Sequence, residues 1–398
     1  MDTAKDDGIR SARTGDGTSA PGGPLVGLRV IELAGLGALP FGTQKLADLG
    51  ADVIRVHRTS EVPAEPRPHT YSEYDRGRRS IAVDLKHPQG VDVVKSLVST
   101  ADVFAEAFRP GVCERLGIGP EALFDCNPRL IYARLTGWGQ DGPLAKVAGH
   151  SLNYEAITGA VGSIGPRDGP PIPLLQVLGD FAGGGLHFAF GVLAAVFEAQ
   201  RSGRGQVVDV AMVDGVLSLF SVYYAMSRTG YHSDEVGTNF FDGGSPSYNV
   251  YETADGKYVT AAPIEPQFYA VFVEALGLDP ATLPDRDDPA NWDDLIARFQ
   301  AVFKTKTRDE WDARLGSIDA CFAPVYRFSE AHEHPANRER NVFRTAPNGE
   351  PELVPVPRYS RTPGDPRANY AYPGSDTDEI VAELGLDAAA LRASGGIA

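Results

Sequence analysis

The chain has 398 residues, 42% of them hydrophobic and 23% charged, which is typical of a globular protein rather than of a fibrous or disordered one. At roughly 150 residues per domain, this length predicts two or three domains and disfavours a single small binding module. The 37 Lys and Arg residues against 53 Asp and Glu give a formal net charge of −16, which argues against sequence-independent binding to nucleic acid or to an anionic membrane.

The cysteines and the apolar stretches narrow the class of protein further. Three cysteines share no close ligand spacing, so we expect no disulfide framework, no metal site and a reducing, cytoplasmic location: Cys113, Cys126 and Cys321. Residues 1–24 contain no apolar signal-peptide segment and are predicted to form a disordered tail. The longest apolar stretches, 187–197 and 210–226, are short or contain an Asp, which predicts no membrane span.

The first part of the chain alternates between buried-type strands and amphipathic helices. From Leu25, LVGLRVIELA predicts a strand, TQKLADLG a helix and ADVIRVHR a second strand. The pattern continues in the order strand, helix, strand, helix, strand through SIAVDLK, GVDVVKSLVSTA, DVFAEAF, EALFDCNP and LIYARLTGWG. Because parallel strands are joined by crossover helices, this order predicts an α/β domain with a parallel sheet.

A long helix is predicted next. It begins at Asp180, a favoured N-cap residue, and continues through LHFAFGVLAAVFEAQRSG to Gly203 or Gly205. Arg201 lies in its last turn, where the helix dipole stabilises a cation. The strand GQVVDVAM follows, and we assign residues 25–225 to a large domain.

The pattern changes after this region. SYNVYETADGKYVTAAP predicts a hairpin with its turn at Asp255-Gly256, followed by amphipathic helices. We interpret 244–325 as a smaller α+β domain. Residues 326–376 are rich in Pro and Arg and predict an irregular connection, and two short helices are expected after it. About 326–398 would thus complete the large domain.

Gly35-Leu36-Gly37 lies between a predicted strand and a predicted helix, where a dinucleotide fingerprint would lie. Pro40 replaces the third glycine of that fingerprint, and the next strand ends in basic residues rather than in an acid for a ribose. The motif therefore favours a simple strand-to-helix turn. A nicotinamide-dependent oxidoreductase is the weaker alternative.

A basic cluster interrupts the acidic chain between Tyr74 and Lys86. It contains Arg76, and Arg109 follows further along the chain. Guanidinium groups match the geometry of phosphate oxygens, so the cluster predicts a phosphate-bearing ligand. A solvated charged loop is the other interpretation, and both stay open.

Three residues are candidates for acid–base chemistry. His150 lies in a glycine-rich loop, and Asp180 precedes the glycines 183–185, where a ligand can approach the backbone closely. The start of a helix keeps a carboxylate ionised, as a base or a nucleophile requires. Glu265 follows a predicted strand of the small domain. Each residue also has an ordinary structural interpretation. His150 would be an isolated histidine, Asp180 a helix cap and Glu265 a solvated loop acid.

Taken together, these segments resemble the class III CoA-transferase superfamily, and most closely its α-methylacyl-CoA racemase branch. The resemblance covers about Pro24 to Pro363 and rests on GLRVIELAG, LADLGADVIRV, RGRRSIAVDLK, FRPGV, RLIYARLTGWGQDGP, AGHSLNY, GDFAGGG, GQVVDVAMVDG, DGGSPSYNVYETADGKYV and IEPQFY. It implies a Rossmann-like large domain, a smaller domain and an interlocked homodimer. The active site would lie between the large domain of one chain and the small domain of its partner.

The resemblance also implies roles for individual residues. His150 and Asp180 match the acid–base pair of the racemases, and Glu265 matches an acid that supports the histidine. The implied reaction is epimerisation of 2-methylacyl-CoA thioesters through an enolate, without a metal or a redox cofactor, and with CoA as part of the substrate. Four residues fall in segments that bind CoA in the family: Arg76, Leu85, Lys86 and Arg109.

Two alternatives stay open. In the CoA-transferases of this superfamily, the aspartate that matches Asp180 is a nucleophile that forms an acyl anhydride, and that route does not require His150. A CoA-binding protein without catalysis would keep the basic cluster and lose nothing on replacement of either residue.

One position departs from the racemase pattern. Ser151 stands where Asp commonly follows the histidine, so a negative charge beside His150 is absent. We predict that this difference lowers the basicity of His150 or alters the substrate preference.

Overall fold

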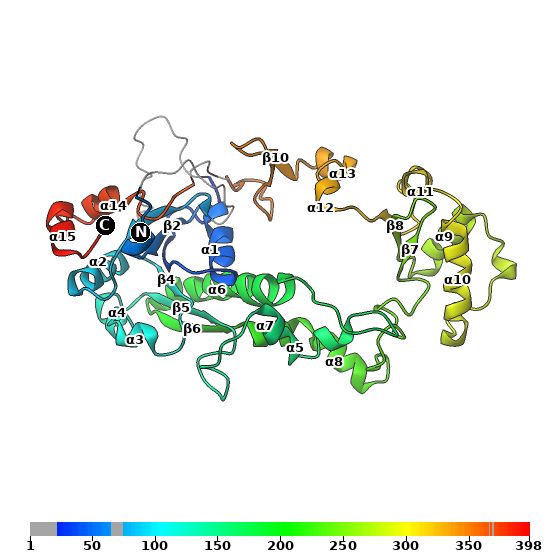
Figure 1. The fold of residues 1–398 in the computed structure, drawn as a ribbon, viewed down its shortest axis with the longest axis horizontal. Coiled ribbons are helices and arrows are strands. Elements are labelled where there is room, and N and C mark those ends of the chain that lie inside the picture. Colours follow the sequence, from blue (N-terminus) through cyan, green and yellow to red (C-terminus); the bar gives the residue numbers. More distant parts are fainter. Residues whose placement is uncertain (1–21, 65–74, 366, 368–369) are drawn as a thin grey trace, which may run out of the picture. The chain divides into compact units, whose positions relative to one another are not determined.

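The computed structural model describes residues 22–64, 75–365, 367 and 370–398, so the predicted tail 1–24 falls almost entirely outside the described residues. The chain forms two compact units (Figure 1). Unit 1 comprises residues up to Tyr154, Leu175–Ser218 and Arg340–Ala398, and unit 2 comprises Glu155–Leu174 and Leu219–Glu339. Unit 2 is therefore larger than the segment 244–325 assigned from the sequence.

Unit 1 is built on a six-stranded parallel sheet with the strand order β3-β2-β1-β4-β5-β6. The order reverses between β1 and β4, and doubly wound sheets of this kind bind ligands at the carboxyl ends of the strands beside such a reversal. The expected α/β, Rossmann-like fold is confirmed. The strands are β1 (Arg29–Leu33), β2 (Asp52–His57), β3 (Arg79–Ala82), β4 (Val103–Glu106), β5 (Ile131–Thr136) and β6 (Gln206–Ala211).

Helices cover both faces of this sheet, because successive strand residues point to opposite faces and both sets are apolar. Val30 lies in the core on the face covered by α1 (Ala38–Asp48) and α6 (His187–Ser202). The next residue, Ile31, lies in the core on the other face. That face is covered by α2 (Pro88–Val98), α3 (Val112–Arg115), α4 (Pro120–Cys126), α14 (Thr377–Glu383) and α15 (Ala388–Ser394).

The helix expected to begin at Asp180 begins earlier and in another form. Val177–Leu186 form a π-helical segment, η4, that continues directly into α6. Asp180 lies inside η4, so the prediction that it is the N-cap is wrong. The predicted end is confirmed, because Gly203 adopts the left-handed conformation directly after Ser202.

Close packing explains why this segment is rich in glycine. A Cβ on Gly185 would lie 2.8 Å from the carbonyl oxygen of Ala38 in α1, and a Cβ on Gly183 would lie 3.0 Å from that of Met212. Met212 begins α7 (Met212–Leu219). Larger side chains would push η4, and Asp180 with it, away from both helices.

The run Val177–Ser202 is longer than either apolar stretch on which the expectation of no membrane span was based. Together η4 and α6 form one helical run of 26 residues, which by length and composition alone could cross a membrane. That expectation was based on the stretch 187–197 and did not include Val177–Leu186, which are also helical. Within unit 1, the run contributes Phe188 and Val192 to the core, as core helices of globular domains do.

Unit 2 contains a three-stranded antiparallel sheet of β7 (Asn249–Glu252), β8 (Tyr258–Ala261) and β9 (Phe322–Pro324). The predicted hairpin is confirmed, with Gly256 in the left-handed conformation at its turn. The aromatic core of unit 2 lies between this sheet and three helices, α9 (Pro266–Leu276), α10 (Trp292–Phe303) and α11 (Arg308–Leu315).

The segment expected to be irregular, 326–376, contains four short elements. The two short helices expected after it are confirmed as α14 and α15. The four elements are α12 (Phe328–Ala331), α13 (Pro335–Glu339), β10 (Phe343–Thr345) and β11 (Pro351–Leu353). The remaining helical elements are η1 (Thr59–Glu61), α5 (Ser151–Ala156), η3 (Val161–Ser163), α8 (Ser221–Arg228), η5 (Pro280–Thr282) and η6 (Pro289–Asn291).

Candidate active site

Most of the predicted site residues follow strands of the unit 1 sheet. Leu85 and Lys86 follow β3, Arg109 follows β4, and His150 lies between β5 and α5. The strands are parallel, so their carboxyl ends meet at one edge of the sheet. The topology therefore gathers residues that are far apart in the sequence at this edge.

A cavity of about 640 Å³ lies at this edge, and we refer to it as the basic cavity. Three cations line it, Arg58, Lys86 and Arg109, together with the hydroxyl residues Thr59 and Ser60. Its apolar lining consists of Val83, Leu85, Phe108, Val112 and Leu116. The volume is within the usual range of small-ligand sites, about 300–1,000 Å³. Clustered cations suit phosphate groups, and the apolar wall suits a flat base.

The basic cavity contains three of the four predicted CoA residues and one that the prediction missed. Leu85, Lys86 and Arg109 line it, and so does Arg58, which follows β2. The sequence signal for Arg58 was the basic end of the strand ADVIRVHR, which we used only as evidence against a dinucleotide fingerprint.

Arg76 lies elsewhere. It is 1% exposed, and its guanidinium contacts Asp48 at 2.8 Å and pairs with Glu352. Arg76 precedes β3 whereas Lys86 follows it, so the two cations lie beyond opposite ends of this strand. The predicted role of Arg76 in binding CoA is therefore not supported, and its buried ion pairs indicate a structural role.

The loop that carries Arg109 is held at both ends by one arginine of β5. Glu106, at the end of β4, accepts a hydrogen bond from the backbone N–H of Phe108 at 2.7 Å and lies 3.1 Å from Nε of Arg134. Arg134 also pairs with Glu114 in α3, beyond the loop. Burial raises the pKa of Glu106 to about 7, although the Phe108 N–H and Arg134 oppose that rise. These contacts fix the loop against the sheet.

His150 and Asp180 come from segments that Ser151 joins. The backbone N–H of Asp180 donates to Oγ of Ser151 at 3.1 Å, and Ser151 is only 6% exposed. The backbone N–H of His150 donates to Oδ1 of Asn153 at 3.0 Å, which closes the N-terminus of α5. His150 is exposed and Asp180 is half-buried, so both side chains are accessible to a bound substrate.

The carboxylate of Asp180 approaches the glycine turn after β1. The φ of Gly37 is +70°, a conformation that favours glycine, and a Cβ there would lie 2.9 Å from Oδ2 of Asp180, so a larger residue would also displace the carboxylate. Gly37 is the N-cap of α1, where exposed N–H groups create a partial positive charge. The motif is thus a strand-to-helix turn that accommodates the carboxylate.

Tyr154 lies within electrostatic range of both Asp180 and Arg109. Burial and, next, the charge of Asp180 raise the pKa of its phenol, whereas Arg109 lowers it, so both charges act on this ring. Its hydroxyl donates to the carbonyl oxygen of Gly149, and its ring packs edge-on against Trp138 with 4.7 Å between centroids. Sequence reasoning did not single out Tyr154, although it closes the motif AGHSLNY.

Glu265 belongs to unit 2, whereas His150 and Asp180 belong to unit 1. Glu265 is exposed at the N-cap of α9. Its role beside the histidine stays a prediction.

Comparison with known proteins identifies the family of the chain. Residues 25–378 match the family described as CoA-transferase family III. The chain is 44% identical over 363 residues to an alpha-methylacyl-CoA racemase of Mus musculus, covering 91% of this chain and 93% of the relative. It is 40% identical to the Homo sapiens protein of that name, covering 91% and 94%. Its fold matches the crystal structure of a CAIB/BAIF family protein from Brucella suis with a TM-score of 0.79, at 26% identity over 91% of this chain and 100% of that one. The chain therefore belongs to CoA-transferase family III.

Proposed function

We propose that this protein is an isomerase that racemises the α-carbon of 2-methylacyl-CoA thioesters. The observation that carries the proposal is the hydrogen bond from Asp180 to Ser151, which joins the segments of His150 and Asp180 at the sheet edge that also carries the basic cavity. The similarity to two alpha-methylacyl-CoA racemases over 91% of the chain supports it.

The basic cavity suits the nucleotide part of CoA. The cations Arg58, Lys86 and Arg109 would hold phosphate oxygens by charge-assisted hydrogen bonds. The apolar wall formed by Leu85 and Phe108 would cover the adenine. Binding energy from this remote part of the substrate would place the α-carbon between the acid–base pair.

The chemistry requires one base, one acid and stabilisation of an enolate. One group removes the α-proton, and the electrons of the broken C–H bond move to the thioester oxygen. The other group returns a proton to the opposite face, so the C–H bond reforms with inverted configuration. His150 and Asp180 would exchange these roles with the direction of the reaction. No oxidation state changes, so the reaction balances without an electron acceptor.

The start of α1 would assist the developing charge. Gly37, the N-cap of α1, lies beside the carboxylate of Asp180, and the free N–H groups of the first turn of α1 follow it in the chain. Fixed backbone dipoles of this kind stabilise an enolate oxygen without reorganisation during the reaction.

We also propose that the enzyme is a homodimer. An apolar stripe on α6 and the residue before it supports this assembly: Leu186, Phe190 and Phe197 are 50%, 73% and 63% exposed. Burying such side chains against a second copy is favourable, at about 25 cal/mol per Å² of apolar surface. In this dimer, Glu265 would act beside His150 of the other chain.

The alternative within the same family is CoA transfer, with Asp180 as a nucleophile that forms an anhydride with the acyl group. His150 distinguishes the two reactions, because only racemisation needs a second acid–base group.

The test follows hydrogen at the α-carbon. A single epimer of a 2-methylacyl-CoA is incubated with the protein in deuterated water, and deuterium uptake is measured by mass spectrometry together with loss of stereochemistry. We expect both in the wild type and in Asp141→Ala, a control at an exposed aspartate, and a large loss in His150→Ala and Asp180→Ala. Transfer of CoA to an added carboxylate that depends on Asp180 alone would establish the transferase instead.

A further inference from the structure

We propose that residues 396–398, which we call the C-terminal strap, are positioning residues for CoA: they pair with the chain after β3 and thereby fix one wall of the basic cavity. The inference rests on the proposed function, because CoA is the ligand assigned to that cavity.

The strap extends the sheet beyond β3. β3 is the outermost strand at one end of the described sheet. The backbone N–H of Asp84 donates to the carbonyl oxygen of Gly396 at 3.0 Å, and the N–H of Ala398 donates to that of Ala82 at 3.2 Å. The strap thus forms an antiparallel pair with the residues at which β3 ends.

Packing holds the strap in this place. Ile397 pairs with Val83 in an antiparallel bridge, is 4% exposed and belongs to the same hydrophobic core. A Cβ on Gly90 in α2 would lie 3.1 Å from the carbonyl oxygen of Gly396. The strap is therefore wedged between the end of β3 and the first turn of α2.

The contacts continue from the strap to a cation of the cavity. Asp84, which donates to Gly396, accepts a hydrogen bond from the backbone N–H of Lys86 at its own Oδ1, at 2.9 Å. Val83, Asp84, and Lys86 all line the basic cavity. Releasing the strap would remove one partner of Asp84 and allow the Lys86 turn to move relative to Arg109 across the cavity.

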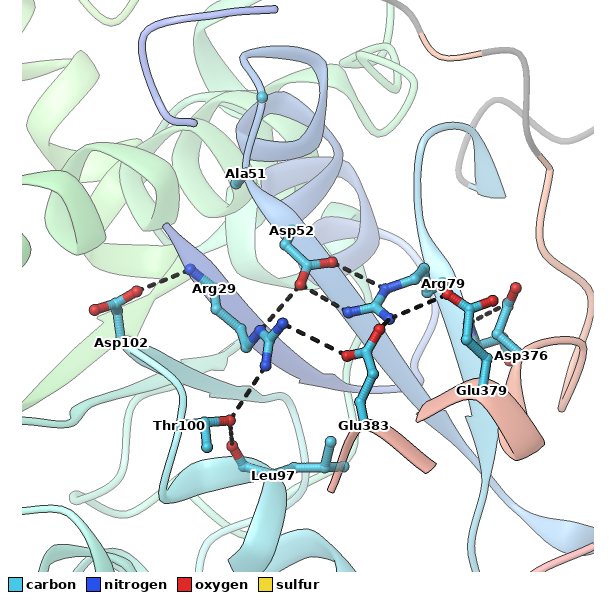
Figure 2. A network of polar contacts seen from close by, with 12 residues as sticks. Arg29, Ala51, Asp52, Arg79, Leu97, Thr100, Asp102, Asp376, Glu379 and Glu383 are labelled. Atoms are coloured by element: carbon cyan, nitrogen blue, oxygen red, sulfur yellow. Dashed lines mark hydrogen bonds and ion pairs between the residues drawn. The ribbon is translucent and has the colours of Figure 1, made fainter. Parts of the chain in front are cut away.

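The same C-terminal segment is anchored a second time, at the other end of β3 (Figure 2). Glu383 in α14 contacts Arg79 at 2.6 Å, and Arg79 contacts Asp52 at 2.8 Å. Asp376 accepts a hydrogen bond from the N–H of Ser80 at 2.8 Å. Because these contacts lie where β3 begins, Glu383→Gln weakens docking of the C-terminal segment far from the cavity and is a matched control.

The experiment compares a variant lacking residues 396–398, Ile397→Ala and Glu383→Gln with the full chain. CoA affinity is measured by calorimetry, and KM and kcat by racemisation. We expect Kd and KM to rise about tenfold in the shortened variant and less in Ile397→Ala, with kcat changed less than about twofold, since one wall rather than the acid–base pair is loosened. Glu383→Gln should keep the wild-type Kd even if its melting temperature falls.

Hydrogen exchange in the ligand-free protein tests the strap independently of the reaction. The amides of Asp84 and Lys86 should exchange faster in Ile397→Ala than in the wild type. Unchanged exchange and unchanged CoA affinity in a folded Ile397→Ala variant would overturn the inference. If the wild type binds no CoA while the exchange difference is present, CoA is not the ligand of the cavity, but the result still supports the claim that the strap fixes the cavity wall.

Discussion

Ser151→Ala is the sharpest test of how the acid–base pair is held together. The substitution removes the Oγ that accepts the backbone N–H of Asp180 at 3.1 Å, at a position that is 6% exposed. A buried N–H that loses its acceptor costs about 1–3 kcal/mol. Because this N–H belongs to Asp180 itself, we expect the cost to appear in the placement of its carboxylate during proton transfer.

The expected result is a fall in kcat of roughly 5- to 140-fold, since about 1.4 kcal/mol corresponds to a factor of ten. KM should change little, because Ser151 does not line the basic cavity. The assay measures deuterium uptake from each epimer and racemisation at several substrate concentrations. Ser151→Thr, which retains the hydroxyl, should recover much of the rate, and Ser99→Ala controls for loss of an exposed serine in unit 1.

A folded Ser151→Ala variant with wild-type kcat and an unchanged pH profile would refute this reasoning. Equal losses in Ser151→Ala and Ser151→Thr would show that shape rather than the hydrogen bond matters at this position.

Four further perturbations test other parts of the structure. Ser151→Asp places a carboxylate beside the histidine, which should raise the basicity of the imidazole. The acidic limb of the kcat/KM profile should then move to higher pH. The same pH profile and substrate preference as the wild type would contradict this prediction. Arg58→Ala should raise KM for the acyl-CoA about tenfold with little change in kcat, measured by steady-state kinetics, and an unchanged KM would remove Arg58 from the CoA site. Gly37→Ala places a Cβ 2.9 Å from Oδ2 of Asp180 in a left-handed conformation, so racemisation should fall at least tenfold and thermal stability by about 1–2 kcal/mol; full activity would show that the carboxylate moves freely. Burial alone would raise the pKa of Asp52, but Arg79 and Arg29 hold it below its usual value (Figure 2). The Asp52 carboxylate therefore contributes stability above its unfolded pKa of about 3.9, and this contribution is lost as the pH falls through the lower folded pKa. The urea midpoint of Asp52→Asn should thus decline less than that of the wild type below about pH 4. Parallel declines of the two midpoints would contradict the assignment.

The sequence by itself determined the α/β class of unit 1 and the position of the hairpin in unit 2. Runs such as LRVIEL place apolar residues on both faces, Val30 on one and Ile31 on the other, which suits a sheet covered on both sides, so a parallel sheet with flanking helices follows from the pattern. Asp255-Gly256 fixed a turn because glycine adopts the left-handed conformation there at low cost. These are local properties of backbone and periodicity, and they do not depend on which strands become neighbours.

The tertiary structure decided which residues meet. Arg76 and Lys86 are close in the sequence, yet the strand between them sends one into a buried ion pair and the other into the basic cavity. Arg58 and Arg109, far apart in the sequence, share that cavity because parallel strands end at one edge.

The acid–base site shows the same division. The motifs around His150 and Asp180 indicated both residues, but only the folded chain places Ser151 against the N–H of Asp180 and Gly37 against its carboxylate. The π-helical segment η4 likewise depends on close contacts with α1 and α7 that no local pattern encodes. Contacts between distant segments depend on strand order and on packing, and these are properties of the whole chain rather than of any short stretch of it.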